Sequence, residues 1–367
     1  MSFCLSRQGQ IVSHERSRMG EWMQQSEQSG QQHPGLEFDP ADDMAVAHDD
    51  PRLRHTLQVY HDNWFGIASA SAALPGHKLR LKADKLDAAA AATVAGFIVH
   101  HHINRVCFQG FSEAAEALLR ALRQACSPDV RFYAVSHVTA TQFQAPFEIR
   151  MQAALRTCQA DGTLQAVGSV KPHFHEVVPG TWHKTILNFC PRLTPAGKPA
   201  GGHVFIPVEN HWRKGLYTNL IAALRARGPG QITCVHEPKH LELLEDISGV
   251  RVTGFLSRAA MHAEISKATA VMNVSLAECQ PMTQLEAFAL GRPCLTGPLG
   301  LEEFEDDPLV ALCTVPRVDT PHDIILKLET LLETQAGDPA ALQQMTSAHV
   351  VRRNGLAAAR YAEFFDL

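Results

Sequence analysis

The chain has 367 residues, of which 45% are hydrophobic and 19% charged, and its formal net charge at pH 7 is −5. This length is more than one ordinary hydrophobic core holds, so about two domains are expected in a protein of soluble globular composition. The acidic balance argues against a surface that binds duplex nucleic acid through bulk basicity, although a local basic groove stays compatible with it.

Targeting signals and disulfides are not predicted. No run approaches the roughly 20 apolar residues that a membrane span needs, and the first twenty residues contain charged side chains with no apolar core, unlike a signal peptide. The nine cysteines are scattered singly without a CxxC pair, which is typical of reduced thiols in a cytoplasmic protein. We therefore expect a cytoplasmic protein without a transmembrane segment.

Residues 1–54 are polar and weakly periodic, and we predict an N-terminal extension that is partly disordered, above all over 23–34. Residues 55–190 alternate short apolar runs with amphipathic stretches, which is typical of strand–helix units around a parallel sheet. The predicted strands there are 57–61, 78–82, 105–109, 130–135, 164–167 and 185–189. The predicted helices are 68–74, 112–126, with Ser112 as its N-cap, and 147–160.

Residues 191–202 (PRLTPAGKPAGG) hold three prolines and three glycines, which indicates a linker. The same alternation then restarts and predicts a second domain over 203–350. Its predicted strands are 203–208, 231–235, 250–253, 270–274 and 293–296, and its predicted helices are 216–227, 241–246, 259–267, 281–290 and 321–334. A last helix, 354–365, lies in a C-terminal segment 351–367 that is able to cross back to the first domain. The expected fold is α/β, with two doubly wound Rossmann-like domains facing a cleft.

The segment from Ser275 to Gly291 (SLAECQPMTQLEAFALG) carries the main functional signal. Glu278 follows a predicted strand, where parallel sheets bind ligands, and Glu286 lies inside the next helix. The free amides at the start of that helix suit a phosphate, and the two carboxylates suit hydroxyls on either side of it. By spacing alone, two glutamates eight residues apart are better explained as solvated surface residues.

The surrounding residues resemble the E-x7-E signature of retaining glycosyltransferases of the GT-B type, family 4-like. The matching positions are Ser275, Glu278, Pro281, Leu285, Glu286, Ala287, Gly291, Arg292 and Pro293. The resemblance implies that Glu278 holds hydroxyls of the transferred sugar and that Glu286 holds the ribose. It also implies donor contacts from Gln280, Pro281, Met282 and Thr283, where this chain departs from the small Gly-rich turn usual in the family.

Two further segments of the second half resemble the same family. Lys214 and Gly215 match its "KG" helix start, so Lys214 is expected to stabilise the departing diphosphate. The family commonly has an arginine at the position of Glu209, and Arg213 is the candidate to supply that charge. The loop residues Gly254, Phe255 and Leu256 are expected to border the nucleotide base.

The first half resembles the family less closely. His137, after the strand 130–135, is expected at the donor sugar, although a merely structural histidine explains it about as well. Gly66 and Ile67 are candidates for a loop near the acceptor and the diphosphate. We place His100, His101 and His102 on a strand, where three adjacent residues cannot all face one ion, so no metal site is predicted.

The resemblance implies a retaining, metal-independent hexosyltransferase-type enzyme (EC 2.4) that needs no cofactor. Its donor is expected to be a nucleoside-diphosphate sugar, with a UDP-sugar favoured, and its acceptor a hydroxyl of a glycan or lipid-linked glycan. Three alternatives stay open: a non-catalytic partner protein of the same type, a sugar-nucleotide epimerase or phosphorylase of the same fold, and a glycosyltransferase acting on modified nucleic-acid bases. The oligomeric state is not predicted.

Overall fold

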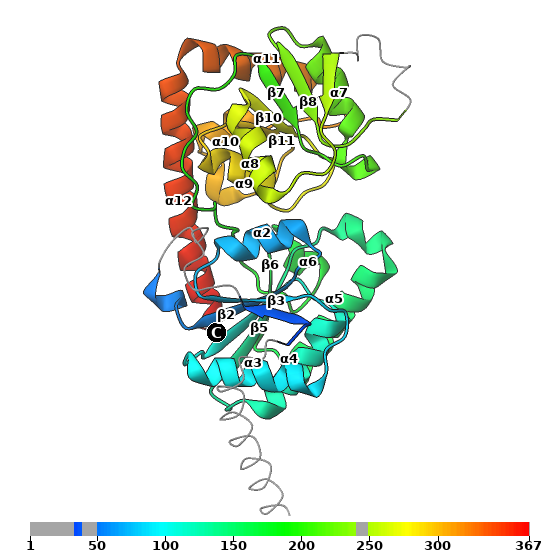
Figure 1. Ribbon diagram of the computed structural model, residues 1–367, viewed down its shortest axis with the longest axis vertical. Coiled ribbons are helices and arrows are strands. Elements are labelled where there is room, and N and C mark those ends of the chain that lie inside the picture. The colour runs from blue at the N-terminus through cyan, green and yellow to red at the C-terminus, as the bar shows by residue number, and fades with distance from the viewer. Residues whose placement is uncertain (1–32, 39–49, 240–248, 367) are drawn as a thin grey trace, which may run out of the picture.

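The computed structural model describes residues 33–38, 50–239 and 249–366 of the chain. It contains two α/β domains, one above the other in Figure 1, and the long helix α12 (Pro339–Phe365) runs beside both. The expected fold of two Rossmann-like domains is confirmed.

The N-terminal domain is built on a six-stranded sheet with the strand order β1-β3-β2-β4-β5-β6. Its strands are β1 (Leu36–Phe38), β2 (Thr56–His61), β3 (His77–Leu81), β4 (Arg105–Gln109), β5 (Arg131–Ser136) and β6 (Ala166–Ser169). Its helices are α2 (Phe65–Ala73), α3 (Ala88–His100), α4 (Glu113–Ala125), α5 (Pro146–Ala160) and the short α6 (Phe174–Val177). All strand pairs are parallel except that of β1 with β3.

Apolar side chains of the N-terminal sheet belong to two hydrophobic cores, one on each face of the sheet. On β4, Val106 and Phe108 join the core under α3, α4 and α5, while Cys107 between them joins the core on the opposite face. On β5, Phe132 likewise belongs to the core under the helices, and Tyr133 to the core on the opposite face. Successive side chains of a strand point to opposite faces, so a continuous apolar run is required where both faces are covered.

The C-terminal domain is built on a five-stranded parallel sheet with the order β11-β10-β7-β8-β9. Its strands are β7 (His203–Ile206), β8 (Gln231–Cys234), β9 (Val250–Val252), β10 (Ala270–Asn273) and β11 (Cys294–Thr296). Its helices are α7 (Leu216–Arg225), α8 (Arg258–Lys267), α9 (Met282–Ala289), α10 (Pro308–Cys313) and α11 (Pro321–Gly337). Within the described residues, four 3-10 helices connect elements of the two domains: Pro51–Leu53, Ala140–Gln144, Trp212–Lys214 and Glu302–Phe304.

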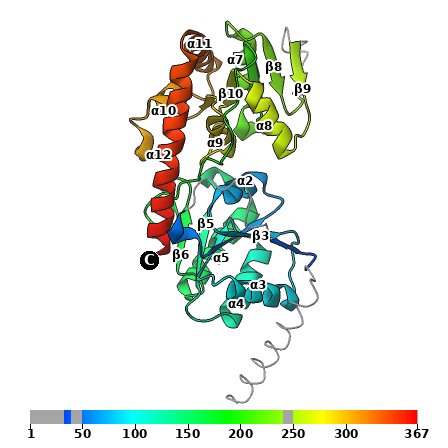
Figure 2. The same ribbon diagram turned by 60° about the vertical axis from the view of Figure 1, so that its left-hand side comes forward.

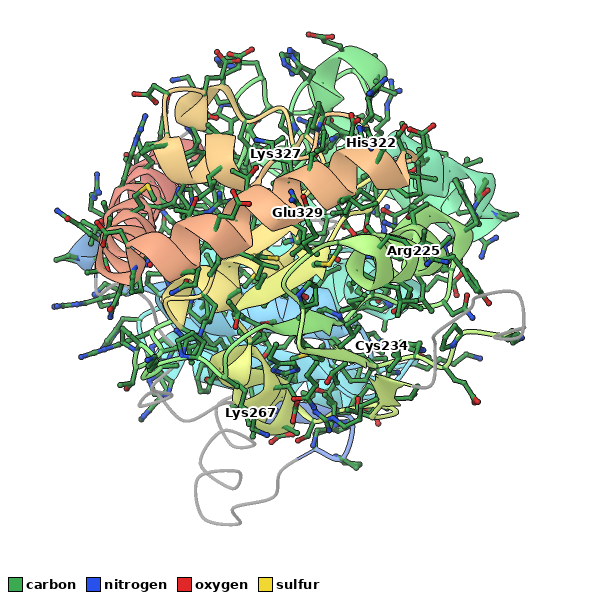
Figure 3. The ribbon with its side chains drawn as sticks, turned by 90° about the horizontal axis from the view of Figure 1, so that it is seen from above. Arg225, Cys234, Lys267, His322, Lys327 and Glu329 are labelled. Atoms are coloured by element: carbon green, nitrogen blue, oxygen red, sulfur yellow. The ribbon has the colours of Figure 1, made fainter. Side chains whose placement is uncertain are left out.

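Figure 3 looks down on the C-terminal domain, where α11, carrying His322, Lys327 and Glu329, lies beside α7, which carries Arg225. Glu329 ties the two helices together, because its carboxylate accepts hydrogen bonds from the backbone and side chain of Arg227 just after α7. Helices α7 and α11 lie at the end of the molecule remote from the N-terminal domain (Figures 1 and 2).

The predicted strand over 185–189 is wrong. This segment is buried and runs beside β6, where the amide of Ile186 donates to the carbonyl of Ser169 at 2.9 Å, but it forms no strand. The backbone amide of Asn188, two residues further on, donates instead to the side chain of Gln280 at 2.8 Å. Side chains of the other domain thus take the place of a strand neighbour, which a pattern of apolar residues cannot reveal.

The histidine run over 100–102 is not on a strand, as the sequence led us to expect. His100 ends helix α3, His101 caps it, and His102 has a left-handed φ of 52°. The helix itself was not predicted, because it is rich in alanine and lacks a clear polar stripe. Asp87 provides its N-cap, accepting from the amide of Ala90.

Order also begins earlier than expected, since β1 lies within the extension predicted over 1–54 and pairs with the edge of the sheet. The disordered stretch predicted over 23–34 falls almost entirely outside the described residues, as does the helix predicted over 241–246. The C-terminal helix begins at Pro339, well before residue 354. Among the described helices, none is long and apolar enough to span a membrane.

Candidate active site

A cleft of about 980 Å³ is lined by residues of both domains. Its walls are loops that follow the carboxyl ends of strands in both sheets, including those after β2, β4, β5, β7, β9 and β10. Open parallel sheets bind their ligands at these ends, where loops are free to vary without disturbing the core. The cleft is therefore the candidate active site.

Three charged side chains converge on one wall of this cleft. The Nζ atom of Lys214 lies 2.5 Å from Oε1 of Glu278, and Nη1 of Arg213 lies 3.8 Å from Oε2 of the same carboxylate. Arg213 is steadied by a 2.6 Å hydrogen bond to the carbonyl of Ala277. Although adjacent in sequence, the two cations point to the same place, and with Glu278 they carry a formal charge of +1. Glu209, at the position where the family has arginine, is exposed on the same wall.

The start of helix α9 lies beside this charge cluster. Pro281 occupies the N-cap position, one residue earlier than the first turn in which the sequence placed it, and its side chain gives no capping hydrogen bond. The amides of Met282 and Thr283 have no backbone acceptor in the described part of the chain, while that of Gln284 donates to the carbonyl of Pro281. Both residues line the cleft. Free amides and the helix dipole make this a favourable seat for a phosphate.

Glu286 lies further along α9, is 6% exposed and also lines the cleft. Its Oε1 accepts a short hydrogen bond from the hydroxyl of Ser69 on α2 and lies 3.6 Å from Nε2 of His262 on α8. Ser69 and His262 were not predicted, because they are distant in sequence and match no motif. The carboxylate is thus held in the cleft by both domains.

Gln280 was predicted as a donor-binding residue, and in the structure its side chain is engaged by the protein itself. The amide nitrogen donates to the carbonyls of Val170 and Ile186 at 2.7 and 2.8 Å. The amide oxygen accepts from the backbone of Asn188 and from Arg353 of α12. Two donors and two acceptor positions are all that a glutamine side chain has, so none is left for a ligand. Gln280 instead fastens the α9 loop to the N-terminal domain.

The same loop makes two more contacts across the cleft. Nζ of Lys171 donates to the carbonyl of Glu278 at 3.0 Å, and Sγ of Cys279 lies 3.6 Å from the carbonyl of His137. Burial raises the pKa of the Cys279 thiol to about 12, so this sulfur is a protonated donor and not a nucleophile. The loop that presents Glu278 is therefore positioned by the opposite domain.

His137 follows β5 and lines the cleft from the N-terminal side. Burial lowers its pKa to about 4, so the imidazole is neutral at pH 7. Its Nε2 lies 2.9 Å from Oε1 of Gln109, whose own amide nitrogen donates to Gln58 at 2.9 Å. This assignment of the amide makes Nε2 the protonated nitrogen and leaves Nδ1 as a hydrogen-bond acceptor.

The remaining predicted residues divide into two groups. Gly66, Ile67, Phe255 and Leu256 line the cleft, and the exposed ring of Phe255 lies 5.2 Å from that of Phe65 across its mouth. Gly215 and Gly254 do not line it. Gly215 has a left-handed φ of 63° at the start of α7, where a Cβ would crowd Thr218, so its contribution is to the backbone turn that follows Lys214.

No group of three or more histidine, cysteine, aspartate or glutamate side chains is placed to hold a metal ion within the residues that the structure describes.

Comparison with known proteins identifies the C-terminal half. Residues 215–334 match the family model described as glycosyl transferases group 1. These residues are therefore similar to a glycosyltransferase domain. No curated protein sequence matches the chain.

Solved structures extend the likeness to the fold of both domains. S. aureus TarM in complex with fondaparinux, alpha-GlcNAc-glycerol and UDP superposes with a TM-score of 0.53 and 12% identity, over 72% of this chain and 55% of TarM. Anabaena HepE in complex with UDP and glucose gives 0.52 and 14%, over 85% of this chain and 91% of HepE. An alpha-glucosyltransferase in complex with UDP and a 13-mer DNA containing an HMU base gives 0.55 and 10%, over 85% and 98%.

The chain thus spans about half the length of TarM. The GT-B fold and the glycosyltransferase class expected from the sequence are confirmed.

Proposed function

We propose that the protein transfers a sugar from a nucleoside-diphosphate sugar to an acceptor hydroxyl, with retention of anomeric configuration and without a metal ion. The observation that carries this proposal is the convergence of Lys214 and Arg213 on Glu278, beside the free amides at the start of α9. A pair of cations next to a helix N-terminus suits a diphosphate, and it takes up the negative charge that grows as the diphosphate leaves.

The other proposed contacts follow from the same arrangement. Glu278 accepts hydrogen bonds from hydroxyls of the transferred sugar, and Glu286, deeper along α9, accepts from the ribose. Neutral His137, on the opposite wall, accepts a hydrogen bond at Nδ1 from a hydroxyl of the sugar. A uridine nucleotide is favoured because the TarM and HepE structures both contain UDP.

In the transfer step, the acceptor oxygen bonds to the anomeric carbon on the face from which the diphosphate departs. The bond between that carbon and the phosphate oxygen breaks, and the proton of the acceptor hydroxyl passes to the departing diphosphate. This scheme requires no separate general base. The linker over 191–202, which forms neither helix nor strand, is the proposed hinge for closure over the donor.

The first experiment is a thermal-shift comparison of UDP, GDP and ADP. At a concentration a hundred times its Kd, the preferred nucleotide should raise the free energy of unfolding by about 2.7 kcal/mol. UDP is expected to give the largest rise in Tm. If none of the three raises the Tm, the proposed donor site is wrong.

The second experiment incubates the protein with the sugars of the preferred nucleotide, with and without EDTA. We expect free nucleotide to be released equally with and without EDTA. NMR of the product should show the same anomeric configuration as in the donor sugar. Nucleotide binding without release would favour a non-catalytic protein, inversion would exclude retention, and inhibition by EDTA would exclude the metal-free scheme.

A further inference from the structure

The N-terminal wall of the cleft differs in chemistry from the wall that carries the charge cluster. Six of its residues form one apolar and aromatic surface with a single carboxylate: Trp64, Phe111, Phe147, Glu148, Met151 and Leu155. We call this surface the aromatic wall. The rings of Trp64 and Phe147 meet edge to face with centroids 6.3 Å apart, and both side chains are half-buried.

The two aromatic rings are fixed by the fold. Trp64 follows β2 and lies over Gly110 after β4, where a Cβ on the glycine would come within 2.9 Å of the indole. Phe147 lies in the first turn of α5 and packs against the core under the sheet. A rigid ring surface binds a flat ligand face at low entropic cost, because little side-chain freedom is lost.

Glu148 is the polar group of the aromatic wall. It is half-buried, and in the described part of the chain no hydrogen bond or ion pair holds its carboxylate. Burial raises the pKa of this carboxyl. A half-buried carboxylate facing a cleft without a protein partner is costly for folding alone, so it points to a ligand that donates hydrogen bonds.

Charge restricts the chemistry of that ligand. The charged side chains on the N-terminal side of the cleft are Asp62, Glu148 and Arg80, and the Nε of Arg80 is engaged by the hydroxyl of Tyr60 at 3.0 Å. This side therefore carries a formal excess of one negative charge. On the C-terminal side the three cations Lys214, Arg213 and Arg258 are matched in number by Glu209, Glu278 and Glu286, so that side has no such excess. A phosphate group placed on the aromatic wall would face this negative charge.

We propose that the aromatic wall is the acceptor subsite and that it binds a neutral pyranose ring of a glycan, not a phosphate-bearing acceptor. The apolar face of the sugar ring, with its weakly positive C–H groups, lies against the negative face of one of these aromatic rings and beside the other, because Trp64 and Phe147 are tilted by 66° to each other. A hydroxyl of the same ring donates to Glu148. The assignment of this surface as the acceptor subsite rests on the proposed function, whereas the binding of a neutral sugar ring to it does not.

The test follows the fluorescence of Trp64, with and without UDP, during titration of the full chain. The probes are the methyl glycosides of glucose, galactose, mannose and N-acetylglucosamine, the corresponding sugar phosphates, and a short oligodeoxynucleotide. We expect at least one neutral glycoside to change the signal with a Kd about tenfold lower than that of its phosphate. Trp64→Phe should remove the signal, because Trp182 and Trp212, the other tryptophans in the described part of the chain, do not line the cleft.

Glu148→Gln separates a ligand contact from a structural role. The change should raise the Kd of the neutral glycoside by about tenfold, since a charged hydrogen-bond acceptor is lost, and should lower the Kd of the sugar phosphate. Glu333→Gln, an exposed glutamate on α11, is the matched control and should alter neither value.

Three results would overturn the proposal: no signal from any neutral glycoside, equal or tighter binding of the phosphates, or tight binding of the oligonucleotide alone. Because the titration does not require turnover, its failure is distinct from the failure of UDP to raise the Tm, which would instead refute the donor site.

Discussion

The charge cluster at the cleft makes a quantitative prediction for Lys214→Ala. Lys214, Arg213 and Glu278 together carry a formal charge of +1, and removing the ammonium, which lies 2.5 Å from Glu278, lowers it to zero. The loss of one preorganised donor at a developing charge typically costs about 2.7–4 kcal/mol, so kcat should fall by about 10²–10³. Lys85→Ala, an exposed lysine outside the cleft, is the control and should keep the wild-type rate.

Arg213→Ala should have the smaller effect. Its guanidinium lies 3.8 Å from Glu278 and already donates to Ala277, so we expect a fall in kcat of about tenfold. If both cations act on the same departing diphosphate, their effects should be coupled, so the loss of kcat in the double variant should differ from the product of the single effects, about 10³–10⁴.

The assay is the initial rate of nucleotide release at saturating donor, together with the donor Kd from calorimetry. Two results would refute the reasoning. One is a kcat for Lys214→Ala within tenfold of the wild type. The other is a kcat for Lys214→Ala in a Glu278→Gln background equal to that of Glu278→Gln alone, which would mean that Lys214 only holds the carboxylate in place.

Three further predictions concern the residues around this cluster. Glu286→Ala should raise the Kd of UDP about tenfold or more, because a charged acceptor for the ribose is lost; an unchanged Kd in calorimetry would remove Glu286 from the donor site. Gln280→Ala should lower the free energy of unfolding in urea by roughly 3 kcal/mol, since it leaves buried backbone groups and Arg353 without partners, whereas exposed Gln124→Ala should change it by no more than about 0.5 kcal/mol. His137 has a pKa of about 4 when folded and near 6.5 when unfolded, so its neutral form stabilises the fold above pH 6.5 and this contribution is lost as the pH falls toward 4. The stability difference between wild type and His137→Asn should accordingly shrink by up to about 3 kcal/mol over that interval, and a constant difference would contradict the assigned burial.

Elements with strong local signals were predictable from the sequence. The helix α4 has Ser112 as its N-cap and an apolar face, and β10 and α9 follow the apolar and Pro-initiated pattern of their segment. Helix α3 was missed because its alanine-rich sequence has little periodicity. The strand predicted over 185–189 failed because its neighbours on one side are side chains of Gln280 and Arg353, far along the chain.

The candidate site shows the same division. A local motif was enough to place Glu278, Glu286 and Lys214 at one cleft. The side chains that hold them, such as Ser69 on Glu286, come from the other domain and carry no sequence signal. The resemblance assigned Gln280 to the donor because it occupies the motif, but only the structure reveals that its hydrogen-bonding groups are already satisfied.

Helix α12 has a consequence for how the chain folds during its synthesis. Its end fills one face of the N-terminal sheet: Tyr361, Phe364 and Phe365 belong to the same core as Tyr133, whose hydroxyl donates to the carbonyl of Phe365. Domains usually fold in order as they leave the ribosome. Here the first domain keeps an apolar face uncovered until residue 365 has emerged, so its completion follows the synthesis of the second domain. A nascent chain that stops before α12 should therefore be protease-sensitive in its N-terminal half and depend on chaperones, even though all six strands of that sheet are already present.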